Sequence, residues 1–137
     1  MRRMLRYSSA IAAATLSLAA AAADGNGLAR PNLALRQIVE AMPGGKKQEV
    51  RVFTAAFKPG DRTVTHTHRF PVTVYVLEGA FTLELDGRSP VIVKAGEAYV
   101  EPPLVKMTGY NRSASEPTRV VVFYVSDVDT PFLDAAH

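Results

Sequence analysis

The sequence predicts an all-β protein, an antiparallel sandwich or small barrel. Short runs of β-branched and aromatic residues recur through most of the chain, and turn signals separate them about every eight to twelve residues. Several runs alternate apolar and polar side chains with the two-residue period of a strand. The dipeptide Asp86-Gly87 stands between two such runs and is a strong hairpin signal. These three observations favour sheets over helices.

The first expected elements precede the turn at Pro59-Gly60. Residues 24–33 contain glycine and proline and predict a flexible lead-in. Residues 33–42 fit a short helix or a strand, and we expect a strand because Pro43-Gly44-Gly45 ends the segment as a turn. Residues 49–57 alternate Val50 and Val52 with Arg51 and Phe53 and predict the next strand.

Shorter strands follow, each bounded by a turn. They are expected at residues 63–68, 72–77, 81–85, 91–93, 98–101, 105–110 and 119–126. Asp86-Gly87 predicts a type I′ turn, which needs positive φ at both central positions. Pro102-Pro103 ends strand pairing, because proline has no amide hydrogen to donate. The tail, residues 127–137, is acidic and predicted to be irregular, with Phe132 and Leu133 as the residues able to pack.

The N-terminal stretch has the pattern of a secretory signal peptide. Arg2, Arg3 and Arg6 form a basic start, an alanine-rich apolar run follows, and Ala21 and Ala23 supply the small residues of a cleavage site. We therefore expect residues 1–23 to be removed and the mature protein to be periplasmic or secreted. No other run approaches the length of a membrane span, so we expect no stable membrane insertion.

Loss of the leader changes the charge balance of the protein. The full chain has 16 basic and 13 acidic residues, and three arginines leave with the leader, so the mature chain carries 13 of each. A near-neutral protein lacks the basic surface that nucleic acid binding requires, so no nucleic acid partner is expected. The chain has no cysteine, which excludes disulfides and thiolate chemistry.

Two histidines, His66 and His68, mark the segment most able to carry chemistry. They are two residues apart in a run of β-forming residues. Alternate residues of a strand point to the same face, so both imidazoles project the same way, with their bases roughly 6–7 Å apart. That spacing lets two rings converge on one metal ion.

The residues around this pair resemble the two signatures of the cupin family. Gly60, His66, His68 and Gly79 fall on the first signature, G-x5-H-x-H-x3-E-x6-G, without a gap. Three residues fall on the second, G-x5-P-x-G-x2-H-x3-N, namely Gly96, Pro102 and Asn111. The resemblance covers residues 50–125 and implies a small jelly-roll barrel over residues 34–126 with a central cavity. It also implies a homodimer.

The chain departs from the family at three positions. The resemblance implies a divalent metal held by two histidines, a glutamate and a third histidine, but Val72 stands at the glutamate and Met107 at the last histidine. Leu104 replaces the glycine of the second signature. Two ligands alone make a weak site, so any Fe, Mn, Ni, Zn or Cu is expected to be weakly held.

The sequence leaves four functions open. In the first, the cavity binds a small molecule without a tightly held metal, and His66 and His68 bond the ligand or act as catalytic acid or base. In the second, a metal-dependent enzyme of oxygenase or isomerase type holds a divalent ion with both histidines plus water or Glu101. The sequence does not show whether the Glu101 side chain faces the cavity. In the third, His66, His68 and Met107 bind copper(I). A structural protein with a filled cavity is a fourth alternative.

The phase of the strands predicts the character of the cavity. If the two histidines face it, then Val72 and Val74 face it too and give it an apolar wall, to which Met107 and Leu104 add. A cavity with two imidazoles at one point and an apolar surround suits a small ligand with an apolar body and one polar group. We therefore expect His66, His68, Val72 and Met107 to contact the ligand.

Overall fold

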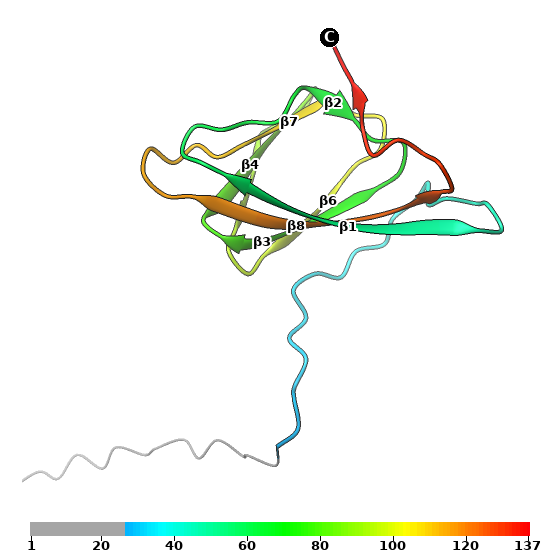
Figure 1. Ribbon diagram of the computed structural model, residues 1–137, viewed down its shortest axis with the longest axis horizontal. Helices are drawn as coiled ribbons and strands as arrows, with labels where there is room; N and C mark the ends of the chain where they lie inside the picture. The colour runs from blue at the N-terminus through cyan, green and yellow to red at the C-terminus, as the bar shows by residue number, and fades with distance from the viewer. Residues whose placement is uncertain (1–26) are drawn as a thin grey trace, which may run out of the picture. The chain divides into compact units, whose positions relative to one another are not determined.

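The chain folds into two antiparallel sheets in the computed structural model, which describes residues 27–137 (Figure 1). The first sheet contains, in spatial order, β1 (Gln48–Phe57), β8 (Thr118–Asp127), β3 (Val72–Glu78) and β6 (Ala98–Glu101). The second contains β5 (Val91–Lys94), β4 (Ala80–Leu85), β7 (Met107–Tyr110), β2 (His66–Thr67) and β9 (Asp134–Ala135). The leader predicted for residues 1–23 lies outside the described residues.

The architecture confirms the predicted all-β class and the jelly-roll arrangement. Figure 1 shows β1, β8 and β3 on one side of the fold and β2 and β7 on the other. Within the described residues the two sheets are not hydrogen-bonded into a closed barrel. Residues Asn32–His137 form one compact unit. Among the residues described, none belongs to a helix of the length and apolarity that crossing a membrane requires.

The core lies between the sheets and follows from strand alternation. On β3, Val72, Val74 and Val76 are fully buried and alternate with the half-buried Thr73 and Tyr75. The valines on one face of β3 thus meet the inward residues of the second sheet. The apolar cluster that results consists of Val74, Val76, Phe81, Leu83, Leu85, Val93, Met107 and Val120.

The corner between β3 and β4 requires a glycine. Gly79 has a φ of 73°, in the left-handed region that other residues enter at a cost. A Cβ atom at this position would meet the carbonyl oxygen of Pro117 and lie 2.8 Å from Oγ1 of Thr118. Both the conformation and the lack of space therefore exclude a side chain at this point of the family signature.

Three predicted local structures differ from those observed. Residues 33–42 form no strand, because Leu35 and Val39 face a surface groove beside Phe123 while the backbone pairs with neither sheet. The tail, predicted to be irregular, contains the short strand β9. Only the second central residue of the Asp86-Gly87 turn, Gly87, has a positive φ, which is the pattern of a type II turn rather than type I′.

Candidate metal centre

His66 and His68 project into the interior of the fold, as the strand phase predicts. His66 lies on β2, opposite Met107 of β7 and Ala135 of β9, and His68 follows two residues later. Their exposed fractions are 5% and 1%. The Nε2 atoms of the two rings are 3.1 Å apart. The pair is therefore a buried, converging arrangement and not two solvated surface side chains.

Glu101 supplies a third donor, and the register of the sheet explains how. It ends β6 and stands directly opposite Val72 of β3. Residues paired across an antiparallel ladder point to the same face, so the Glu101 carboxylate enters the interior where Val72 does. Its Oε2 atom lies 3.1 Å from Nε2 of His68, and the side chain is buried. The carboxylate that is missing from position 72 is thus present on the neighbouring strand.

Backbone carbonyls fix the orientation of both rings. Nδ1 of His66 lies 2.7 Å from the carbonyl oxygen of Val64, and Nδ1 of His68 lies 2.6 Å from that of Phe132. A carbonyl oxygen only accepts, so each Nδ1 carries the hydrogen and donates it. In the neutral rings each Nε2 then presents a lone pair.

The three donors have the chemistry of a cation site. Nε2 of His68 lies 3.1 Å both from Nε2 of His66 and from the Glu101 carboxylate, and a shared cation would stabilise lone pairs that face one another in this way. Burial lowers the pKa of His66, and nearby His68 acts in the same direction, against the raising effects of the Val64 hydrogen bond and of Glu101. The ring of His66 is therefore neutral at neutral pH, the form that binds metal.

The spacing also fits a metal ion. One ligand atom from each of the three residues lies within 4.8 Å of the other two. Metal–nitrogen and metal–oxygen bonds of about 2.0–2.2 Å place neighbouring donors roughly 3–3.5 Å apart, close to the two 3.1 Å separations observed. The third pair of donors, from His66 and Glu101, lies within the same 4.8 Å.

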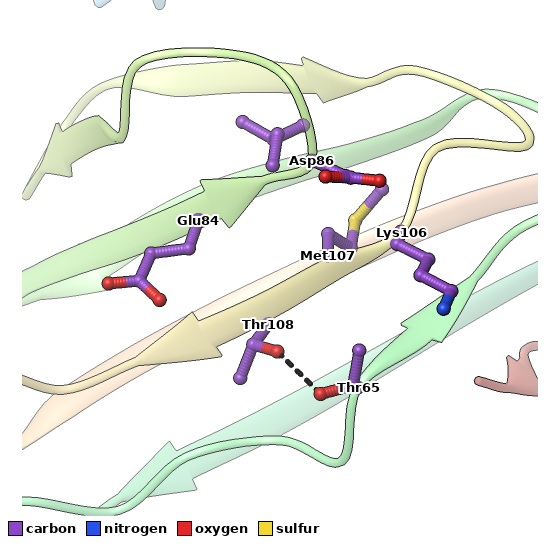
Figure 2. A pocket seen from close by; sticks show the side chains of 7 residues that line it. Thr65, Glu84, Asp86, Lys106, Met107 and Thr108 are labelled. Carbon is purple, nitrogen blue, oxygen red and sulfur yellow. Dashed lines mark hydrogen bonds between the residues drawn. The ribbon is translucent and has the colours of Figure 1, made fainter. Parts of the chain in front are cut away.

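Met107 lies near the pair in register but belongs to the apolar core. It is opposite His66, so the two side chains leave the sheet on the same face. Figure 2 shows it pointing away from Thr65 and Thr108, which share a 2.9 Å hydrogen bond. The pocket of that figure is lined by none of the three donors. Met107 packs in the apolar cluster and does not line the cavity beside the donors. Copper(I) binding by His66, His68 and Met107 stays a prediction.

A cavity of about 270 Å³ lies beside the donors and is walled mainly by apolar side chains. The residues that line it are Phe53, Thr54, Ala55, Phe57, Thr63, His66, His68, Phe81, Glu101, Val120, Val122 and Phe132. The apolar surround is present, but β1, β4, β8 and the tail supply it, and Val72, Val74 and Met107 do not line it. The alternation of residues 49–57 could have identified Phe53 and Phe57. The sequence named Phe132 as a tail residue able to pack, but no signal placed its ring at this cavity.

Leu104 is not part of the cavity wall, contrary to expectation. Its side chain is 75% exposed. Its φ of 61° is in the left-handed region, which agrees with the glycine that the family has at this position. The backbone conformation of the family is thus kept without the residue that adopts it most easily.

The sequence itself matches a known protein family. Residues 53–124 match the Cupin domain, over more than half of the chain. The chain belongs to the cupin family. No curated protein matches this cupin.

Solved structures share the fold at low sequence identity. A cupin-like protein from Thermotoga maritima is 22% identical, with a TM-score of 0.56 over 64% of each chain, so this cupin spans less than two thirds of its length. An RmlC-like cupin with a double-stranded β-helix fold, from Methanocaldococcus jannaschii, is 20% identical over 72% of this chain and 93% of its own, with a TM-score of 0.52. The polyketide cyclase RemF from Streptomyces resistomycificus is 21% identical over 75% and 87%, with a TM-score of 0.51. These likenesses support the fold alone.

Proposed function

We propose that this cupin binds a divalent metal ion through His66, His68 and Glu101 and holds a small molecule in the adjoining cavity. One observation carries the proposal: two imidazole nitrogens and a carboxylate oxygen, all buried, converge with both Nδ1–H groups turned to backbone carbonyls. The sequence favoured a metal-free binding protein because it offered only two ligands. The third donor reverses that order.

The donor set restricts the metal and leaves room for a ligand. Imidazole and carboxylate suit Fe, Mn, Ni, Zn and Cu, and two histidines with one carboxylate are the protein ligands of many mononuclear iron sites. Three protein donors leave coordination positions open, as in catalytic sites. A metal bound here would supply Lewis acidity to one oxygen or nitrogen of the ligand.

The cavity restricts the ligand in size and polarity. Its volume of about 270 Å³ falls just below the roughly 300–1,000 Å³ of sites for drug-sized molecules, so the ligand is small. Phenylalanine and valine side chains form much of its wall, and His66, His68 and Glu101 line it as one cluster. A divalent ion with one carboxylate and two neutral rings carries a charge of about +1, which favours an anionic head group on an apolar body.

A metal-dependent enzyme of oxygenase or isomerase type is the second candidate function. The open coordination positions favour it, since they face the same cavity that would hold the ligand. In such an enzyme the phenyl rings would exclude water, and Glu101 and the two histidines would hold the charge beside the reacting atom. Turnover of a bound carboxylate or enolate by the metal-loaded protein, absent from a Glu101→Gln variant, would distinguish the enzyme from a binding protein.

Metal titration tests the proposal. Protein purified without a polyhistidine tag or chelators is expected to bind about one equivalent of Co²⁺ or Fe²⁺ per chain. His66→Ala, His68→Ala and Glu101→Gln should each weaken binding by more than about 100-fold, because loss of even an outer partner costs 10–100-fold. Met107→Leu is the matched control and should keep divalent metal. Wild-type protein that binds no divalent metal at millimolar concentration would refute the proposal.

We also propose that the protein is exported and forms a homodimer. The export proposal rests on the leader pattern of residues 1–23, and the dimer on the family resemblance. Mass spectrometry of protein from an exporting host should find a chain that begins near Asp24, and light scattering should give twice the mass of the mature chain. An intact leader, or a monomer at micromolar concentration, would overturn the respective proposal.

A further inference from the structure

The end of the chain folds back over the donors. After β8, residues 128–137, here called the C-terminal strap, return to β2, and Figure 1 shows this red segment beside that strand. Within the strap, Asp134 and Ala135 form β9 and pair with Thr67 and His66. The N–H of Ala136 donates to the carbonyl oxygen of Thr65 at 2.9 Å. The strap therefore adds an edge strand directly beside a metal-ligand candidate.

One residue of the strap, Phe132, contacts the site in two ways. Its carbonyl oxygen accepts the Nδ1–H of His68 at 2.6 Å. Its ring lines the cavity, with its centroid 5.0 Å from the ring centroid of His68 and 4.4 Å from that of Phe53. The same residue thus orients a donor and forms part of the wall against which a ligand would lie.

Besides the β9 pairing and the packing of Phe132, two contacts at the surface hold the strap. The Arg69 guanidinium donates two hydrogen bonds to the Asp134 carboxylate, at 2.8 and 2.9 Å. Nζ of Lys106 donates to the carbonyl oxygen of His137 at 2.7 Å. Both contacts are exposed, and exposed ion pairs stabilise a fold only slightly. A two-residue strand and exposed ion pairs are features of the segments of a fold that open most easily.

We propose that docking of the C-terminal strap sets the metal affinity of the site and that Phe132 limits the size of the ligand. This inference rests on the proposed metal site. When the strap leaves, Nδ1 of His68 loses its carbonyl acceptor. The ring then rotates and moves its hydrogen between the two nitrogens, so that the lone pair at Nε2 is no longer fixed toward the metal. Phe132 is accordingly a positioning residue for His68 and a specificity residue for the cavity.

Two kinds of strap variant test the positioning role. Truncation after Thr130 should lower Co²⁺ affinity by about 10–100-fold, the usual cost of losing an outer partner of a metal-binding histidine. Asp134→Ala should lower it less, and the charge exchange Arg69→Asp with Asp134→Arg should restore it. Arg112→Ala is the control, because it removes an exposed arginine that pairs with Glu84 and leaves the strap intact.

Nitrogen NMR of the metal-free protein gives a second readout. The His68 ring should carry its hydrogen on Nδ1 in the full-length chain and exchange between both nitrogens in the truncated one. If the wild-type protein binds no Co²⁺, the proposed metal function fails. The tautomer shift would then still show that the strap orients the His68 ring. Truncated and Asp134→Ala proteins that keep wild-type Co²⁺ affinity and the Nδ1–H tautomer would overturn the positioning role.

The specificity role of Phe132 is tested with two carboxylates of different size. Benzoate and 2-naphthoate are titrated into the Co²⁺ protein and followed by the visible spectrum of the ion. Phe132→Ala should improve 2-naphthoate relative to benzoate by at least about tenfold, as enlarging an apolar pocket does. An unchanged ratio would show that Phe132 does not limit the ligand.

Discussion

Replacing Leu104 with glycine is expected to stabilise this cupin. Leu104 has a φ of 61°, and its side chain is 75% exposed. Its N–H donates to the carbonyl oxygen of His68 at 2.8 Å, so the residue is held in this conformation by a contact to the segment that carries a metal-ligand candidate. The substitution thus removes backbone strain and loses little buried surface.

The expected gain is small but measurable. The left-handed conformation costs a non-glycine residue roughly 1–2 kcal/mol. Glycine costs about 0.5–1 kcal/mol more to order than other residues do. The difference is a gain of about 0.5–1 kcal/mol in the free energy of unfolding. With an unfolding entropy of about 2.1 cal/mol/K per residue over Asn32–His137, the Tm should rise by about 2–5 °C.

Thermal and urea unfolding of purified protein measure this gain. Leu33→Gly is the matched control, since Leu33 is also 75% exposed and its φ is not positive. It should lower the Tm slightly or leave it unchanged, because only the entropic cost of glycine remains. A Leu104→Gly protein no more stable than wild type, or equal to the control, would show that the left-handed conformation carries no cost here.

Three further predictions follow from the register, the packing and the charges. Glu101→Val should abolish metal uptake, and adding Val72→Glu should restore part of it, because the two positions are direct partners in the ladder; a double variant that stays metal-free would contradict this. Gly109→Ala should lower the free energy of unfolding by about 1–3 kcal/mol, measured in urea, because a Cβ would overlap a phenylalanine ring; an unchanged midpoint would contradict it. The hydrogen bonds from Arg69 lower the pKa of Asp134, so this pair stabilises the fold above the ordinary carboxyl pKa and is lost in acid; a stability difference from Asp134→Asn that persists at pH 2 would contradict it.

The sequence could identify those features that depend on the geometry of a single strand or turn. The spacing of His66 and His68 predicted a shared face, because strand alternation depends only on local backbone geometry. The valines of β3 are buried for the same reason. The glycine signals at Gly79 and Gly96 also mark corners, and both residues have positive φ.

The parts that depend on pairing between distant segments could not be predicted. Glu101 faces the histidines only because β6 pairs with β3 in one register, and a shift of one residue would have turned it outward. Phe132 enters the cavity because the tail pairs with β2, which no local pattern indicates. Residues 33–42 are followed by turn signals typical of a strand end, but they form no strand. A segment becomes a strand only where the fold leaves a free strand edge beside it, and the local sequence does not show this.

The pairing of Val72 with Glu101 has a consequence for recognising metal centres in cupins. A sequence signature is a one-dimensional record of ligands that act in three dimensions. Two positions facing each other across a ladder present side chains to nearly the same volume, so a ligand can migrate between strands while the centre persists. Chains that look degenerate along one strand should therefore be judged by their cross-strand neighbours before they are set aside as metal-free.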